Sequence, residues 1–389
     1  MIDTKTAIEK ITNGEFDNLF TDIYIDSSMI DYQKKRYVHA IEQYETIFCP
    51  DKVAIFSAPG RSEVCGNHTD HQHGMVLATS INLDTIAVSA KNNNDVVRFV
   101  SDGYDMITLD INDLEVNNDE AGTTVSLIRG VLRGLKDHGY KIGGFNAYAT
   151  SDVLVGAGLS SSAAFEVVVG TIISGLYNDM KINSVEIAQI SQYAENVFFK
   201  KPCGLMDQMA CSVGGMVNID FKDPTKPIVK KVPTEFEKYD YSLCIVDTKG
   251  DHVDLTDDYA MIPSEMKKVA NFLGEDYLRD CDSNEFYIRL DEIREAVGDR
   301  PVLRAIHFFN EEYNVKNAVS SLENGKFVEF LDAIRKSGNS SFKYLQNVYT
   351  TRDIQHQNIS VALALSESLL RNYGVCRVHG GDCRYNSGV

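Results

Sequence analysis

The order of strand-like and helical segments predicts an α+β fold in two domains. A chain of 389 residues is longer than the size at which a single hydrophobic core usually stops growing. Strand-like runs fall mainly in the first half, whereas from residue 256 onward the segments show helical spacing. Strands mixed with helices grouped in this way suggest α+β rather than a doubly wound sheet. The turn-rich segment 223–227 (DPTKP) is the candidate boundary, giving domains of 1–222 and 223–389.

In the first domain, residues 1–48 have apolar residues at helical spacing, and Cys49-Pro50-Asp51 interrupts the pattern. Asn183 resembles a helix N-cap. Strands are expected at 53–58, 85–90, 96–100, 107–111, 145–150 and 216–221, and helices at 124–138, 163–177 and 183–199.

The second domain is expected to begin with strands and to be helical thereafter. The expected strands are 228–232 and 241–248, and the expected helices are 256–273, 284–296, 301–323, 326–338 and 357–372.

Composition restricts the partners of the chain. Its 38 basic and 56 acidic residues give a net charge of −18, which argues against nucleic acid or an anionic membrane as a partner. No uninterrupted apolar run approaches the eighteen residues that are typical of a transmembrane helix. The eight cysteines form no C-x-x-C pair, and the sequence shows no pattern typical of a secretory signal peptide. We therefore expect reduced thiols in a cytoplasmic protein.

A glycine- and serine-rich segment, 156–162 (GAGLSSS), lies between an expected strand and an expected helix. Glycines let the backbone approach an anion, and the N–H groups of the first helical turn point at it, which suits phosphate. A Walker A loop is excluded because no Lys precedes the serines. A dinucleotide fingerprint is excluded because Ser161 stands where its third Gly is required. Taken alone, the segment is also compatible with an ordinary flexible connection.

Two further segments are rich in polar groups: 59–74 (PGRSEVCGNHTDHQHG) and 201–208 (KPCGLMDQ). Together with the glycine loop they resemble the motifs of the GHMP kinase superfamily, and within it the galactokinase family. Residues 247–249, 254–259 and 304–307 extend the resemblance over nearly the whole chain. It implies a two-domain fold with the active site in the cleft between the domains. It also implies transfer of the γ-phosphoryl group of ATP, with Mg²⁺, to the anomeric hydroxyl of galactose.

The resemblance also implies roles by position. Asp207 would lie at the reactive hydroxyl with Arg61 beside it, while Ser162 and Glu195 would hold Mg²⁺. An acid at that place either accepts the proton or orients the hydroxyl, and the sequence leaves both open. The ATP-binding residues would be Gly156, Ala157, Gly158, Leu159, Ser160, Ser161 and Ser162, and the sugar-binding residues Asn67, His68, Asp70, Gly204 and Tyr259.

Each candidate also has a purely structural interpretation. Asp207 could be a helix cap, Glu195 an exposed helix residue and Tyr259 a core residue. The histidines 68, 71 and 73 with Asp70 could instead form a transition-metal cluster, although no second group has metal-ligand spacing.

Asn67 departs from the family motif, which has an acid before the histidine (G-E-H-T-D) that touches the 6-hydroxyl of the sugar. Asparagine keeps hydrogen bonding and removes the charge. We therefore hypothesise that a sugar altered at carbon 6, such as galacturonate, is accepted.

The C-terminus also departs, because a third glycine-rich motif begins at 377–381 (RVHGG) and then fails. Residues 383–389 can be encoded by codons that, read one nucleotide later, give Ala-Gly-Thr-Ile-Gln-Val. This peptide resembles the missing glycine and the strand expected after it. A frameshift in the gene or its sequencing is the hypothesis, and resequencing tests it.

Two other functions remain open. The scaffold could serve a non-catalytic sensor of sugar and ATP, which the altered C-terminus favours slightly. Alternatively, the acceptor could be another alcohol, such as mevalonate or homoserine, although the segments 67–70 and 202–208 favour a sugar.

Overall fold

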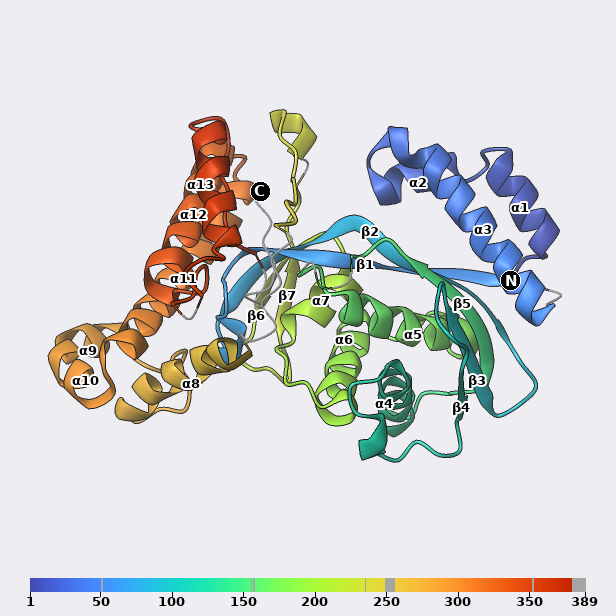
Figure 1. Cartoon of the computed structure of the whole chain (residues 1–389), viewed down its shortest axis with the longest axis horizontal. Coiled ribbons are helices and arrows are strands. Elements are labelled where there is room, and N and C mark those ends of the chain that lie inside the picture. The colour runs from blue at the N-terminus through green and yellow to red at the C-terminus, as the bar shows by residue number, and fades with distance from the viewer. Residues whose placement is uncertain are drawn as a thin grey trace. The chain divides into compact units, whose positions relative to one another are not determined.

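A mixed β-sheet with helices confirms the expected α+β class (Figure 1). The structure is a computed structural model that describes residues 1–49, 52–154, 156, 158–234, 236–248, 256–351 and 353–379. Seven strands form one sheet in the order β4-β3-β5-β2-β6-β7, with β1 paired to β2. The strands are β1 (Ala54–Cys65), β2 (Met75–Lys91), β3 (Val96–Ser101), β4 (Ile107–Asp110), β5 (Phe145–Ser151), β6 (Met216–Asp220) and β7 (Ile228–Lys231).

The chain divides into two compact units, each built from separate stretches. Unit 1 comprises 1–60, 80–154 and 160–214, and unit 2 comprises 61–79, 155–159 and 215–389. The strands β1 and β2 contribute residues to both units. The division of the chain at 222/223 stays a prediction.

In unit 1, β5 pairs antiparallel with β2 and parallel with β3, so that alternate residues face opposite sides of the sheet. On one side, Val88 and Tyr148 belong to a core that includes Tyr44. On the other, Phe99 meets Phe165 with ring centroids 5.1 Å apart. The helices of the first side are α1 (Thr4–Thr12), α2 (Asp17–Tyr24) and α3 (Ile30–Phe48), and those of the second are α4 (Thr124–Asp137), α5 (Ser161–Tyr177), α6 (Ser184–Tyr193) and α7 (Met206–Val213).

A buried ion pair joins α3 to β2. Arg36 Nη1 lies 2.6 Å from Asp84 Oδ1, and both side chains are almost fully buried. Asp84 also accepts hydrogen bonds from Tyr24 and Ser57. These bonds satisfy a carboxylate that would otherwise be costly to bury.

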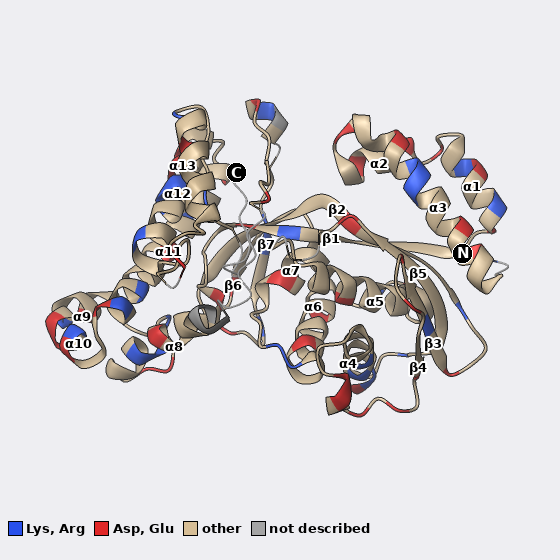
Figure 2. Ribbon diagram, viewed as in Figure 1, with Lys and Arg blue, Asp and Glu red and all other residues tan. Residues whose placement is uncertain are grey.

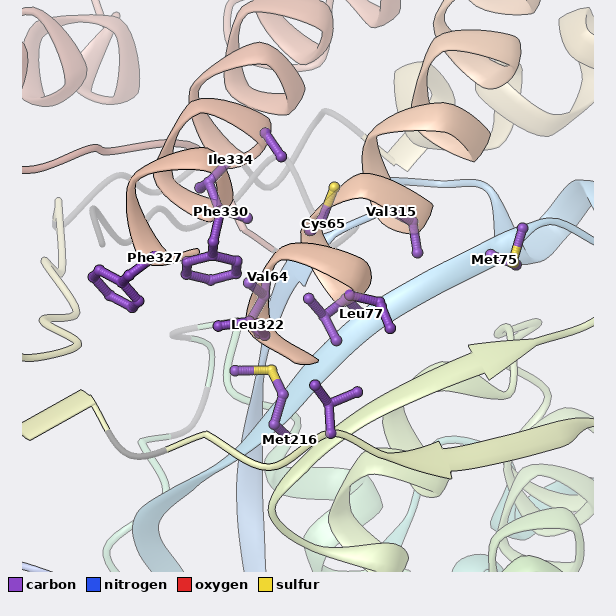
Figure 3. Close-up of a cluster of buried hydrophobic side chains, with 14 of the residues drawn as sticks. Val64, Cys65, Met75, Leu77, Met216, Val315, Leu322, Phe327, Phe330 and Ile334 are labelled. Carbon is purple, nitrogen blue, oxygen red and sulfur yellow. The ribbon is translucent and has the colours of Figure 1, made fainter. Parts of the chain in front are cut away.

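Unit 2 is mainly helical, as expected. Figure 3 shows the core where Val64 and Leu77 of β1 and β2 meet Val315 and Phe330. Its helices are α8 (Thr256–Phe272), α9 (Ser283–Ile288), α10 (Leu290–Val297), α11 (Asp299–Glu323), α12 (Phe327–Ser340) and α13 (Asn358–Leu370). The expected strand at 241–248 is wrong: although the composition is strand-like, the segment pairs with no strand among the described residues. A strand exists only where a neighbour completes its hydrogen bonds, and composition does not supply one.

Short helices complete the described elements. The 3₁₀ helices are Ser27–Met29, Asp70–Gln72, Asn118–Glu120 and Phe236–Tyr239, and the π-helices are Ala194–Phe199 and Ser341–Leu345.

Charged residues of both signs are interspersed on helices such as α10 (Figure 2). Arg289, for example, lies 3.1 Å from Glu285 and 3.0 Å from Glu292. Within the described ranges, no helix is both long and apolar enough to cross a membrane.

Candidate active site

The glycine- and serine-rich segment links β5 to α5, as expected, and its backbone is bent by left-handed residues. Gly156 and Gly158 have φ of 78° and 69°, which glycine adopts without steric cost. Ser160, the N-cap of α5, has φ of 59°. A left-handed conformation at a residue with a Cβ costs about 1 kcal/mol, and such strain clusters at functional sites. Leu159 is buried and Ser161 and Ser162 open the helix, whereas Ala157 lies outside the described residues.

Asp207 lies in the first turn of α7, where the helix dipole favours a carboxylate. Ser160 Oγ donates a hydrogen bond to Asp207 Oδ2 at 2.6 Å. The N-cap residue of α7 is Leu205, so the interpretation of Asp207 as a cap is wrong. The first serine of the loop and the candidate catalytic acid are therefore joined directly.

Glu195 lies on the π-helix Ala194–Phe199, which continues α6, and it is only 3% exposed. The interpretation as an exposed helix residue is therefore wrong. Ser162 Oγ donates to Glu195 Oε1 at 3.2 Å, and Lys201 Nζ lies 3.5 Å from the same oxygen. Single π-turns inside helices occur frequently at functional sites.

Ser162 and Glu195 together offer hydroxyl and carboxylate oxygens, the donor type that Mg²⁺ prefers. In the described part of the chain, no cluster of three or more His, Cys, Asp or Glu side chains is placed to hold a metal. Mg²⁺ is commonly bound by one or two protein oxygens together with substrate phosphates and water, so this sparse set fits it.

Two residues near this pair were missed by the sequence analysis, Glu166 of α5 and Gln208 of α7. Gln208 Nε2 donates to Glu195 Oε2 at 2.7 Å and to Glu166 Oε2 at 3.3 Å. Burial, and then the neighbouring charge of Glu195, raise the pKa of the Glu166 carboxyl well above its usual range. The signal for Glu166 was present in the sequence: an acid stands in an apolar helical run, four residues after Ser162 and so on the same helix face.

The turn before α7, which contains Gly204, is fastened to the π-helix. Cys203 N donates to Asn196 Oδ1 at 2.7 Å, and Asn196 Nδ2 returns a bond to Cys203 O at 3.4 Å. Burial raises the pKa of the Cys203 thiol far above its ordinary value, so the thiol stays protonated. Gly204 is half-buried in this turn.

Arg61 belongs to unit 2 and contacts the glycine loop. Its Nη1 donates to Gly158 O at 2.5 Å, and its backbone N donates to Leu159 O at 3.1 Å. The side chain is 4% exposed. Arg61 therefore holds the loop backbone, while its expected position beside Asp207 stays a prediction.

Asn67 lies in a buried polar network of unit 2. Its Nδ2 donates to Glu63 Oε2 at 2.8 Å, and Asn347 Nδ2 donates to its Oδ1 at 2.6 Å. Glu63 in turn pairs with Arg377 at 2.7 Å, and both are fully buried. Glu63 thus has a buried cation as its partner, and Asn67 itself is neutral.

The other polar residues of the segment 59–74 point in different directions. His68 is buried with φ of 58°, and its ring stacks on His71 with centroids 5.8 Å apart. Asp70 is half-buried and accepts a hydrogen bond from its neighbour's backbone at 3.0 Å. His73 stacks on Tyr277 at 3.6 Å. The arrangement gives no support to a transition-metal cluster in the described segment, and the side chain of Tyr259 lies outside the described residues.

Comparison with known proteins identifies the family of the chain. The family model described as the GHMP kinases N terminal domain matches residues 126–215, and the galactokinase galactose-binding signature matches residues 42–91. A galactokinase of Limosilactobacillus reuteri (strain DSM 20016) is 30% identical over 316 residues, covering 78% of this chain and 79% of the relative. The chain belongs to the galactokinase family.

A further relative agrees with the family assignment, and solved structures agree with the fold. A galactokinase of Streptomyces coelicolor is 29% identical over 309 residues, covering 78% of this chain and 77% of that protein. The crystal structure of Lactococcus lactis galactokinase complexed with galactose has a TM-score of 0.76 at 22% identity, covering 89% and 88% of the two chains. A mevalonate kinase from Methanococcus jannaschii has a TM-score of 0.56 at 15% identity, covering 87% and 89%, and shares the fold alone. The GHMP kinase fold expected from the sequence is confirmed.

Proposed function

We propose that the chain transfers the γ-phosphoryl group of ATP to the anomeric hydroxyl of galactose, with Mg²⁺ as cofactor, in the cytoplasm. The observation that carries the proposal is the joining of one serine loop to two acids within unit 1. Ser160 contacts Asp207 at 2.6 Å, and Ser162 contacts Glu195 at 3.2 Å. Membership of the galactokinase family supports galactose as the acceptor.

The residues of the loop suit the binding of ATP phosphates. The N–H groups in the first turn of α5 have no helical partner and favour an anion. Ser162 and Glu195 would hold Mg²⁺, which when bound neutralises charge on the phosphates. Lys201, which is half exposed, adds a positive charge near Glu195.

Asp207 is the residue expected to act on the acceptor. As the anomeric oxygen forms its bond to the γ-phosphorus, the bond from phosphorus to ADP breaks, and the hydroxyl proton must leave. Asp207 either takes that proton or orients the hydroxyl. The hydrogen bond from Ser160 fixes the position of the carboxylate.

A second acceptor, galacturonate, is favoured by one observation. Asn67 is neutral, and the nearby Glu63 is paired with the buried Arg377. A carboxylate at carbon 6 would meet less repulsion here than beside an acid at position 67.

An assay of ADP release with galactose, galacturonate, glucose and mevalonate tests these proposals. We expect sugar-dependent ADP formation that is fastest with galactose or galacturonate. The Asp207→Asn variant should bind the same sugar and lose at least about 100-fold in rate, the contribution typical of a positioned acid or base. Sugar binding without turnover in the unaltered chain would favour the sensor, and turnover with mevalonate alone would favour another acceptor. A strong preference for galactose over galacturonate would exclude the second acceptor.

A further inference from the structure

Glu166 is a buried acid for which the proposed reaction has no use. It lies on α5, four residues after Ser162, and has no measurable exposure. Its Oε2 accepts a hydrogen bond from Gln208 Nε2 at 3.3 Å, while its Oε1 has no partner among the described residues. A buried carboxyl costs several kcal/mol more than the apolar side chains around it, so its presence calls for a physical reason.

Gln208 connects this acid to Glu195. The side-chain nitrogen of Gln208 donates to Glu195 Oε2 at 2.7 Å and to Glu166 Oε2 at 3.3 Å, and Cys203 Sγ is a third, weaker acceptor at 3.6 Å. Gln208 is itself fully buried. The bond to Glu166 therefore helps to fix the nitrogen of Gln208, and with it the orientation of the Glu195 carboxylate.

The pKa of the Glu166 carboxyl is raised for two physical reasons. Burial raises the pKa of Glu166 most, and the neighbouring charge of Glu195 raises it further. A neutral Glu166 still offers a carbonyl oxygen to Gln208 and adds no negative charge beside Glu195.

We propose that Glu166 is a positioning residue for the cation site: through Gln208 it fixes the carboxylate of Glu195 so that Oε1 stays turned toward Ser162. The inference rests on the proposed function, because it concerns the pair Ser162 and Glu195 that would hold Mg²⁺. Residues that orient a metal-binding carboxylate typically change metal affinity 10- to 100-fold when they are removed.

The arrangement argues against a role for Glu166 as a ligand itself. Glu166 and Glu195 do not form part of any group of three or more metal-binding side chains in the described part of the chain. Gln208 lies between the two carboxyls and bonds to both. The contact of Glu166 with the cation site is therefore indirect.

The test compares two variants of Glu166 that differ in one property. Glu166→Gln keeps a carbonyl oxygen in the same place, whereas Glu166→Leu removes it and leaves Gln208 Nε2 with Glu195 and the weaker acceptor Cys203 Sγ. Calorimetry measures the dissociation constant of the non-hydrolysable ATP analogue AMPPNP with and without Mn²⁺. Electron paramagnetic resonance measures the binding of Mn²⁺ itself. Melting temperatures report whether each variant is folded.

We expect Glu166→Leu to weaken the Mn²⁺-dependent part of AMPPNP binding about 10-fold, and Glu166→Gln to retain it within about 3-fold. The double variant Glu166→Leu/Gln208→Leu should lose no more than Gln208→Leu alone, because both act through one bond. Equal losses in both Glu166 variants would overturn the proposal and make Glu166 an ionised ligand. A lower melting temperature with unchanged Mn²⁺ dependence would also overturn it and leave a purely structural residue.

Measurements on the unaltered chain show whether a negative result contradicts the proposed function or only the positioning role of Glu166. If Mn²⁺ does not strengthen its binding of AMPPNP, the cation site at Ser162 and Glu195 is wrong and the proposed function fails first. If Mn²⁺ strengthens it and the Glu166→Leu variant behaves likewise, only the positioning role fails.

Discussion

Two glycines one turn apart on α4 provide a matched test of how packing places Glu195. A Cβ added at Gly130 would lie 2.7 Å from Cα and Cβ of Ala194, the first residue of the π-helix. A Cβ added at Gly134 would also meet an atom at 2.7 Å, but that atom is Cγ2 of Ile190. The same substitution by alanine therefore presses on backbone in one case and on a side-chain methyl group in the other.

The expected magnitudes follow from two opposing effects. Alanine in a helix interior is favoured over glycine by about 1 kcal/mol. Overpacking a well-filled core costs about 1–3 kcal/mol, and the cost is smaller where a side chain can rotate away. We expect Gly134→Ala to lie within about 1 kcal/mol of the unaltered chain, and Gly130→Ala to lose about 2 kcal/mol of its free energy of unfolding. Because Ala194 precedes Glu195, Gly130→Ala should also weaken the contact of Glu195 with Ser162.

Chemical denaturation and Mn²⁺ titration in the presence of AMPPNP measure both consequences. We expect the Mn²⁺ dependence of binding to fall about 10-fold in Gly130→Ala and to stay unchanged in Gly134→Ala. If Gly130→Ala is as stable as the unaltered chain and binds Mn²⁺ equally well, the close contact of α4 does not hold Glu195 in place. If both variants lose metal affinity equally, the effect belongs to α4 as a whole.

Three further outcomes are expected. Arg36→Met should cost about 3–5 kcal/mol in urea denaturation because Asp84 loses its buried cation, and Asp84→Asn in the same chain should recover part of the loss. Asn67→Glu should lower kcat/KM for galacturonate more than for galactose, and an unchanged ratio would separate Asn67 from the choice of sugar. The raised pKa of Glu166 means that the folded state keeps a proton which the unfolded state loses above the usual range of Glu, so stability falls as pH rises there. Glu166→Gln should therefore gain stability over the unaltered chain between about pH 5 and pH 8, and a constant difference would contradict this.

Local pattern was sufficient to predict most elements of the fold. The helix expected at 163–177 begins two residues earlier, at Ser161, and the expected N-cap Asn183 accepts a bond from Val185 N at 2.9 Å. The expected helix 284–296 is divided into α9 and α10. The strand expected at 241–248 failed because pairing depends on distant segments, which composition does not encode.

The candidate site residues came from the family resemblance, and their contacts could not be predicted. The resemblance names Ser160, Ser162, Glu195 and Asp207, but the bond from Ser160 to Asp207 spans 47 positions of the chain. Nothing in the local sequence indicates that α6 passes into a π-helix at Ala194, which sets the direction of the Glu195 side chain. Asn67 was expected to face the sugar, and its amide is engaged by Glu63 and Asn347, which lie 4 and 280 residues away in the sequence.

The two acids joined to the serine loop lie in different environments, and the difference supports different roles. Glu195 is 3% exposed and is bonded by Ser162 and Gln208, which suits a ligand held in a fixed geometry. Asp207 is only half-buried, and its Oδ2 is bonded to Ser160 at the start of α5. A group that exchanges a proton with an entering hydroxyl must be within reach of that hydroxyl, and the more exposed acid meets this condition. Sequence motifs assign both residues to one site, but burial is the property that distinguishes the acid for the cation from the acid for the acceptor.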